Sequence, residues 1–253
     1  MGLDPLYYII SIPALILATV FSARVKSVFG KYAKVRAESG MTGAEAAATM
    51  LARSGVTDVE IKTVSGFLSD HYNPVDKTLN LSKDVYSGRS LSALGVACHE
   101  AGHALQHASG YRWLGLRTAL VPAANLGSKF AYVVFFVGLM LSAGATGQGG
   151  AAAGAGAAAG AGSGLGLLLV KAGIVLFCGA VAFSLVTLPV EWDASARAKR
   201  QLVKLGLLSP SEEKGAAAVL NTAFMTYVAA AVSSLSTLLY FLLRSGLLGG
   251  RRR

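Results

Sequence analysis

The 253-residue chain has few charged residues, fewer acidic than basic ones, and only two cysteines. Charged side chains make up 14% of the residues and apolar ones 53%, a balance too apolar for an ordinary soluble domain. The two cysteines, Cys98 and Cys178, are too few for a disulfide framework and fit a reducing compartment. The composition therefore predicts an integral membrane protein.

Basic residues outnumber acidic ones by 23 to 13, which gives a formal net charge of +10. We expect no nucleic-acid partner, because aromatic residues are not interleaved with the basic ones. Transport is also disfavoured, because the apolar segments hold hardly any ionisable residue apart from Lys129 and Lys171. Basic residues are concentrated in 24–117 and 197–214, which the positive-inside rule places in the cytoplasm, although the closing run 251–253 opposes this orientation.

One short motif points to chemistry. His99, Glu100 and His103 form an H-E-x-x-H pattern in a stretch of helical character, which Ser90 can cap and Gly110 can end. Positions four apart lie one above the other on a helix, so the two imidazoles can bind one ion. Glu100 lies beside them, where a carboxylate can take a proton from an attacking water. The pattern is typical of zinc hydrolases.

A catalytic zinc site normally has three protein ligands, so the motif lacks one. The acidic residues that follow it are Glu191, Asp193, Glu212 and Glu213. The last two stand at a predicted helix start, where the helix dipole explains acidic residues. Glu191 and Asp193 directly follow an apolar segment, and both remain open as the third ligand.

The polar region before the second apolar segment predicts a small α+β unit. Thr42 and Glu45 have the spacing of a capping box and predict a helix that runs to about Arg53. A basic linker is expected before it, at 24–36.

Two short strands are predicted after this helix. Residues 58–64 and 77–82 alternate polar and apolar side chains, and 71–74 between them has turn chemistry. We expect the second strand, with Asn80, to offer an edge to an extended peptide. His71 either orients substrate from the turn or has only a structural role.

Six stretches resemble those of one known family. They are 66–74 (GFLSDHYNP), 79–82 (LNLS), 85–90 (VYSGRS), 99–106 (HEAGHALQ), 188–195 (LPVEWDAS) and 226–230 (TYVAA). Together they resemble the YugP-type bacterial membrane neutral zinc metallopeptidases. The resemblance implies hydrolysis of protein or peptide substrates with one zinc ion, in the inner (plasma) membrane of a bacterium.

A broader likeness to membrane proteases of the heat-shock and CAAX-processing kind implies a glutamate as third ligand on a second helix. Glu191 is the matching position. Asp193 is then a substitute ligand or a partner that orients a histidine.

The sequence thus predicts a mainly α membrane protein with about four transmembrane helices and a small cytoplasmic α+β zinc-metallopeptidase unit. The predicted divisions are a first transmembrane anchor (1–24), an α+β catalytic unit with the H-E-x-x-H helix (25–118), a second transmembrane helix (119–143), a Gly/Ala-rich loop (144–164), a third transmembrane helix (165–190), a juxtamembrane segment (191–215), a fourth transmembrane helix (216–245) and a basic tail (246–253).

The predicted function is that of an endopeptidase acting on membrane or membrane-proximal proteins from the cytoplasmic side. Zinc would be held by His99, His103 and Glu191, and Glu100 would activate the attacking water. The alternative is a non-catalytic membrane scaffold, whose structural metal site would fill all four positions with protein ligands.

Overall fold

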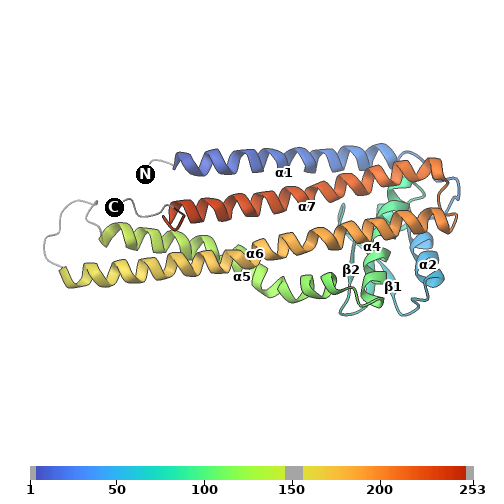
Figure 1. Ribbon diagram of the computed structural model, residues 1–253. Helices are drawn as coiled ribbons and strands as arrows, with labels where there is room; N and C mark the ends of the chain where they lie inside the picture. The colour runs from blue at the N-terminus through green and yellow to red at the C-terminus, as the bar shows by residue number, and fades with distance from the viewer. Residues whose placement is uncertain (1–3, 146–155, 249–253) are drawn as a thin grey trace. The chain divides into compact units, whose positions relative to one another are not determined.

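The computed structural model describes residues 4–145 and 156–248 (Figure 1). These residues form seven helices and three strands. Their bounds are α1 Pro5–Tyr32, α2 Gly43–Arg53, β1 Glu60–Val64, β2 His71–Asn73, β3 Thr78–Ser82, α3 Lys83–Tyr86, α4 Leu91–Ala108, α5 Arg112–Ala145, α6 Gly156–Lys204 and α7 Pro210–Arg244.

Four of these helices are long and apolar enough to cross a membrane. The candidate spans are Pro5–Tyr32, Arg112–Ala143, Gly164–Lys204 and Pro210–Arg244. Large apolar side chains along them are exposed, among them Ile9 at 71% and Val175 at 70%. Such a surface is matched by hydrocarbon rather than by water. The prediction of four membrane helices is confirmed.

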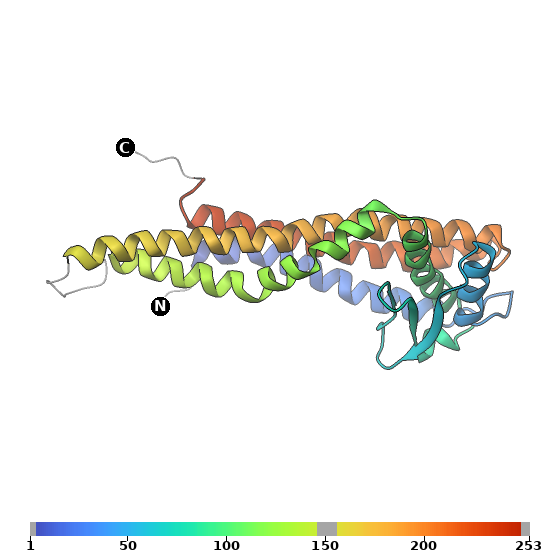
Figure 2. The same ribbon diagram turned by 90° about the horizontal axis from the view of Figure 1, so that it is seen from below.

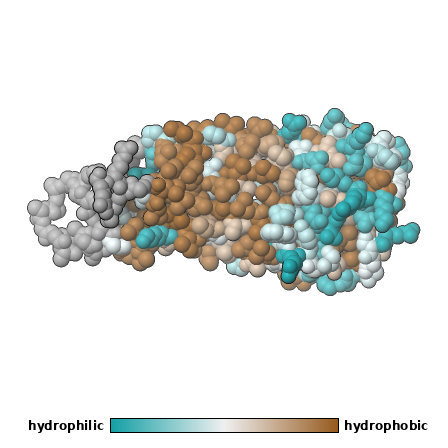
Figure 3. All heavy atoms as spheres, in the orientation of Figure 1, coloured by the Kyte–Doolittle hydropathy of each residue, from teal (hydrophilic) through white to brown (hydrophobic). Residues whose placement is uncertain are grey.

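The chain divides into two compact units. The first unit comprises residues 1–16, 118–185 and 230–253 and consists mainly of apolar helix. Its core is aromatic: the rings of Phe135 and Phe241 stack with centroids 4.0 Å apart. Most of this unit's described atoms are brown, that is hydrophobic, in Figure 3.

The second unit comprises residues 17–117 and 186–229 and holds the sheet, α2, α3 and α4. Its surface is largely teal and white in Figure 3, and its sheet can be followed in Figure 2. The strand order is β1-β3-β2, with β1 parallel and β2 antiparallel to β3. A single apolar core joins sheet and helices, with Met50, Leu79, Leu81 and Leu94 fully buried. This core fixes α4, the helix that carries the motif.

The sheet corrects two predictions. Residues 71–74 do not form only a turn, because His71–Asn73 is strand β2 and the turn follows at 74–77. Pro74 has no N–H for a ladder and ends the strand. The strand around Asn80 offers no edge, because β3 lies between β1 and β2. The free edges belong to β1 and β2.

The helices are longer than predicted. The expected basic linker at 24–36 is helical as far as Tyr32, since lysine and arginine are good helix formers. The third long helix continues past residue 190 to Lys204, so 191–204 is helical as well. Of the predicted Gly/Ala loop at 144–164, residues 156–164 belong to α6, which fits the helix propensity of alanine. Residues 146–155 of that loop, and 249–253 of the predicted tail, lie outside the described residues.

Candidate metal centre

Helix α4 carries two histidines on one face. The side chain of Ser90 accepts a hydrogen bond from the amide of Ala93 and caps its start, and Gly110, with φ of +62°, lies just beyond its end. Both helix-boundary predictions are confirmed. The imidazole centroids of His99 and His103 lie 4.8 Å apart. One helical turn therefore brings the two rings to a common point.

Glu191 reaches this point from α6. Its Oε2 lies 3.1 Å from His99 Nε2 and 3.6 Å from His103 Nε2. The ligand atoms of the three residues lie within 4.8 Å of one another. Around a tetrahedral zinc with bonds of roughly 2.0–2.1 Å, neighbouring ligand atoms are about 3.3 Å apart. The two shorter separations bracket that value, so the three side chains could hold a metal ion.

The surroundings of Glu191 also favour a cation. The residue is 1% exposed, and its Oε1 has no hydrogen-bond partner among the described residues. Arg117 Nη1 stands 3.4 Å from that oxygen. A buried carboxylate oxygen without a hydrogen bond is costly unless a positive charge compensates it, and Arg117 supplies that charge for Oε1 while Oε2 faces the imidazoles. Burial lowers the pKa of His103, but the carboxylates of Glu191 and Glu100 and the hydrogen bond to Gln106 together raise it above its usual value. The pocket thus stabilises positive charge where a metal would lie.

Gln106 sets the tautomer of His103. The side chain of Gln106 is fully buried, and its Nε2 donates to Val190 O at 2.8 Å and to Asp193 Oδ2 at 2.9 Å. Its Oε1 is then the acceptor facing His103 Nδ1, 3.0 Å away. Nδ1 therefore donates to Gln106, and Nε2, on the side of Glu191, is the nitrogen that could bind a metal.

His99 is held in a comparable way. Its Nδ1 lies 3.1 Å from the hydroxyl of Ser195, one turn after Glu191 on α6. Asp193, the other candidate for third ligand, is not in the metal group. Its Oδ2 accepts hydrogen bonds from Gln106 and, at 2.6 Å, from Arg197 Nε. Asp193 therefore contacts Gln106, the partner of His103, rather than the imidazole itself. Of the two candidates, Glu191 belongs to the group that could hold a metal and Asp193 does not.

Gly102 allows the two helices to come this close. A Cβ on Gly102 would lie 2.7 Å from the carbonyl oxygen of Ala194 on α6. Any side chain there would separate α4 from the helix that carries Glu191. The glycine inside the motif thus sets the spacing of the ligands.

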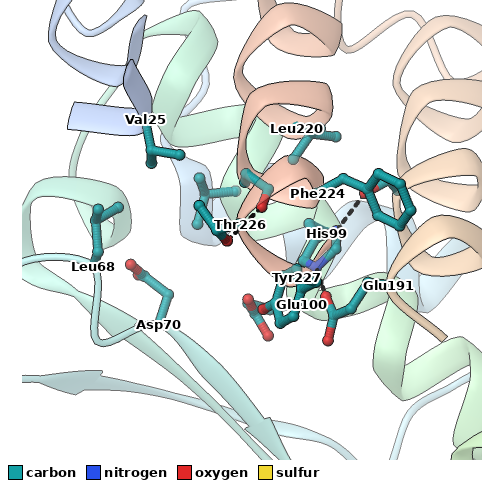
Figure 4. Close-up of a pocket in the computed structure, with 13 residues that line it drawn as sticks. Val25, Leu68, Asp70, His99, Glu100, Glu191, Leu220, Phe224, Thr226 and Tyr227 are labelled. Carbon is teal, nitrogen blue, oxygen red and sulfur yellow. Dashed lines mark hydrogen bonds and ion pairs between the residues drawn. The ribbon is translucent and has the colours of Figure 1, made fainter. Parts of the chain in front are cut away.

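Glu100 stands beside the group. It is 9% exposed, and one carboxylate oxygen accepts a hydrogen bond of 3.1 Å from the backbone amide of Tyr72 in β2. It lines the same pocket as His99 and Glu191, as Figure 4 shows. The carboxylate is oriented by the sheet and open to a molecule in the pocket.

Other candidate residues lie apart from the group. His71 is exposed and contacts Ser69 O through Nδ1, and the amide of Asn80 donates to Thr78 within its own strand. His107 is exposed and bonds to the hydroxyl of Tyr72. None of these side chains joins the metal group.

Cys98, next to the first histidine, is completely buried, and burial raises the pKa of its thiol to about 12. It packs, as the helix geometry predicts.

Four residues at the site were missed or given another role by sequence reasoning. Gln106 follows His103 by three residues and Ser195 follows Glu191 by four, so helical periodicity could have found both. For Tyr227, in the predicted fourth transmembrane helix, sequence reasoning favours packing over donation to an oxyanion, and the residue lines the pocket. No local signal marks Arg117.

The comparisons with known proteins agree with this geometry. The family described as "Putative neutral zinc metallopeptidase" matches residues 7–246. "Putative membrane protease YugP" of Bacillus subtilis (strain 168) is 42% identical over 238 residues, which is 94% of this chain and 96% of that relative. No solved structure matches the chain at a significant level. A match over nearly the whole length, together with a three-residue group that could bind metal, establishes that the chain belongs to this family of neutral zinc metallopeptidases.

Proposed function

We propose that the chain is a zinc-dependent endopeptidase that hydrolyses peptide bonds of membrane or membrane-proximal proteins. The observation that carries the proposal is the convergence of His99, His103 and Glu191 beside the carboxylate of Glu100 in one pocket. Two ligands from α4 and one from α6 leave a coordination position for water, as a catalytic zinc site requires.

Each side chain has a distinct task in this mechanism. Zinc bound by the three ligands would act as a Lewis acid and lower the pKa of a water to roughly 7. Glu100 takes the proton of the attacking water on its carboxylate and passes it to the leaving amine. The Tyr72 amide keeps that carboxylate in place. Gln106 and Ser195 hold the imidazoles so that Nε2 of each faces the ligand carboxylate.

The site's position on α6 supports a substrate close to the bilayer. Glu191 lies on the same continuous helix as a candidate span. Basic residues in 24–117 and 197–214 favour the cytoplasmic face of a bacterial inner membrane. A peptide bond at or near the membrane surface is therefore the expected substrate.

A scaffold with a structural metal is the competing function. A structural zinc site is closed by four protein ligands. Among residues 4–145 and 156–248, the group that could hold metal has three members. Three ligands and an adjacent carboxylate favour catalysis.

Metal content and peptidase activity of four purified proteins test the proposal. The wild type should bind one zinc and cleave unstructured peptide. Glu100→Gln should keep zinc and lose activity, whereas Glu191→Ala should lose zinc. Glu60→Gln, a matched change at an exposed residue of β1, should alter neither property.

Two results would contradict the proposal. Full activity of Glu100→Gln would favour the scaffold. Undiminished zinc in Glu191→Ala would exclude Glu191 as the third ligand.

A further inference from the structure

The candidate metal centre opens into a cavity of about 240 Å³. At about 30 Å³ per water, that is room for roughly eight water molecules, more than the attacking water needs. One wall carries His99, Glu100 and Glu191. The rest of the cavity has no part in the proposed chemistry, so its lining calls for a separate explanation.

Apolar side chains from separate parts of the second unit line much of the rest of the cavity, together with Asp70, Thr226 and Tyr227. Val25 belongs to α1, Leu68 to the loop before β2, and Leu220 and Phe224 to α7. Figure 4 shows these side chains around the pocket that His99 and Glu100 enter from α4. Leu220 is almost completely buried, and the ring of Phe224 packs edge-on against Trp192 at 5.4 Å. The wall is therefore built from packed side chains.

Leu68 is held in place by its loop. Its φ of +54° lies in the left-handed region, which is unfavourable for a residue with a side chain. The hydroxyl of Ser69 donates to the carbonyls of Ser65 and Gly66, and the ring of Phe67 packs edge-on against Phe29. These contacts hold the loop so that Leu68 lines the pocket, where its side chain is 38% exposed.

The charges around the cavity disfavour an acidic guest. The ionisable side chains that line it are those of Asp70, Glu100, Glu191, His99 and Tyr227. Asp70 already accepts hydrogen bonds from the backbone amide of Ser82 at 2.7 Å and from its hydroxyl at 3.2 Å. Three carboxylates among hydrocarbon side chains disfavour an acidic side chain and leave an apolar one as the guest that fits.

We propose that the wall formed by Val25, Leu68, Leu220 and Phe224 receives a branched or aromatic apolar side chain next to the peptide bond that is cut. The proposal rests on the proposed function, and it defines the substrate class: segments with a large apolar residue beside the cleavage point. Continuity of the wall with the metal centre supports this occupant, because a chain whose carbonyl reached the zinc ligands would place a neighbouring side chain in the cavity.

The test uses the full-length zinc-loaded protein and peptides that differ at one position on either side of the scissile bond. That position holds Ala, Leu, Phe or Asp, and mass spectrometry identifies the cleaved bond. The wild type should show kcat/KM roughly tenfold higher for Leu or Phe than for Ala, and the lowest value for Asp. Ala223→Leu fills the pocket from α7 and should cut the Leu-to-Ala and Phe-to-Ala ratios roughly tenfold.

Leu68→Ala is a second variant, with which the proposal can still be tested if Ala223→Leu does not fold. It enlarges the pocket and should shift preference from Leu toward Phe. Val75→Ala, a change at an exposed turn residue outside the pocket, should leave all ratios unchanged. Equal rates for Ala, Leu and Phe in the wild type would overturn the proposal, as would unchanged ratios in Ala223→Leu and Leu68→Ala.

Peptide binding separates this proposal from the proposed function. Glu100→Gln should bind the Leu peptide about tenfold more tightly than the Ala peptide by calorimetry, although it cleaves neither. If every form, wild type included, binds the Leu peptide selectively but cleaves nothing, the proposed function is wrong and the proposed pocket for an apolar side chain is supported. If the wild type cleaves all peptides without selectivity, the proposed function is supported and the proposed pocket is wrong.

Discussion

Replacing Gly102 with alanine should damage the metal centre through the spacing of two helices. The added Cβ would stand 2.7 Å from Ala194 O, whereas a comfortable carbon–oxygen contact needs about 3.3 Å. The helices α4 and α6 would have to separate by roughly 0.6 Å. Metal–ligand distances tolerate about 0.2 Å, so His99 and His103 could not keep their present relation to Glu191. Overpacking of this kind costs about 1–3 kcal/mol, and 1.4 kcal/mol is a factor of ten in affinity.

Gly95→Ala is the matched control on the same helix. Its Cβ would meet the Cβ of Ala216 at 3.4 Å, an ordinary contact. Both variants gain about 1 kcal/mol of helix propensity, so the difference between them isolates the clash at Gly102. We expect Gly102→Ala to bind zinc at least about tenfold more weakly than Gly95→Ala in competition with a chromophoric chelator. Equal zinc affinity in the two variants would refute the argument that Gly102 sets the ligand spacing.

Three further predictions concern the support of the site and its unit. Gln106→Leu removes the partner of His103 Nδ1 and should weaken zinc binding roughly 10- to 100-fold, while Gln106→Glu, which keeps an acceptor, should lose less; the same chelator titration compares them. Thr42→Ala removes the capping box of α2 and should lower the unfolding free energy by about 0.5–2 kcal/mol in denaturant titrations, and an unchanged midpoint would contradict this. With Cys178 replaced by serine, the fully buried Cys98 should react with iodoacetamide only after unfolding, so rapid labelling of native protein would show that α4 is not packed as described.

Features encoded by neighbouring residues were predictable from the sequence. The start of α4 at Ser90 and the two histidines depend on positions within one or two helical turns. The helix that begins after Thr42 depends on a capping box whose two members, Thr42 and Glu45, are three positions apart. Strand β2 was missed because its residues carry turn chemistry, and only their pairing with β3 makes them a strand. Strand order is likewise set by contacts between distant segments, so an alternating pattern could not reveal that β3 is central.

The site shows the same division between local and distant information. His99 and Glu191 are 92 residues apart, and elimination among acidic residues left Asp193 as an equal choice until the family likeness was considered. The contacts of the two side chains distinguish them, because Glu191 faces the imidazoles whereas Asp193 accepts a hydrogen bond from Gln106. A sequence does not state which of two carboxylates, two positions apart on a helix, turns inward.

The bond from Gln106 to the carbonyl of Val190 has a consequence for how relatives of this protein are compared. Position 190 contributes a backbone carbonyl oxygen, which all twenty amino acids possess, to the Gln106 side chain that orients His103. The side chain at position 190 can therefore change among relatives while the hydrogen bond to Gln106 is kept. A comparison of amino-acid substitutions would not reveal the role of this carbonyl. Only a three-dimensional structure reveals a backbone carbonyl in this role.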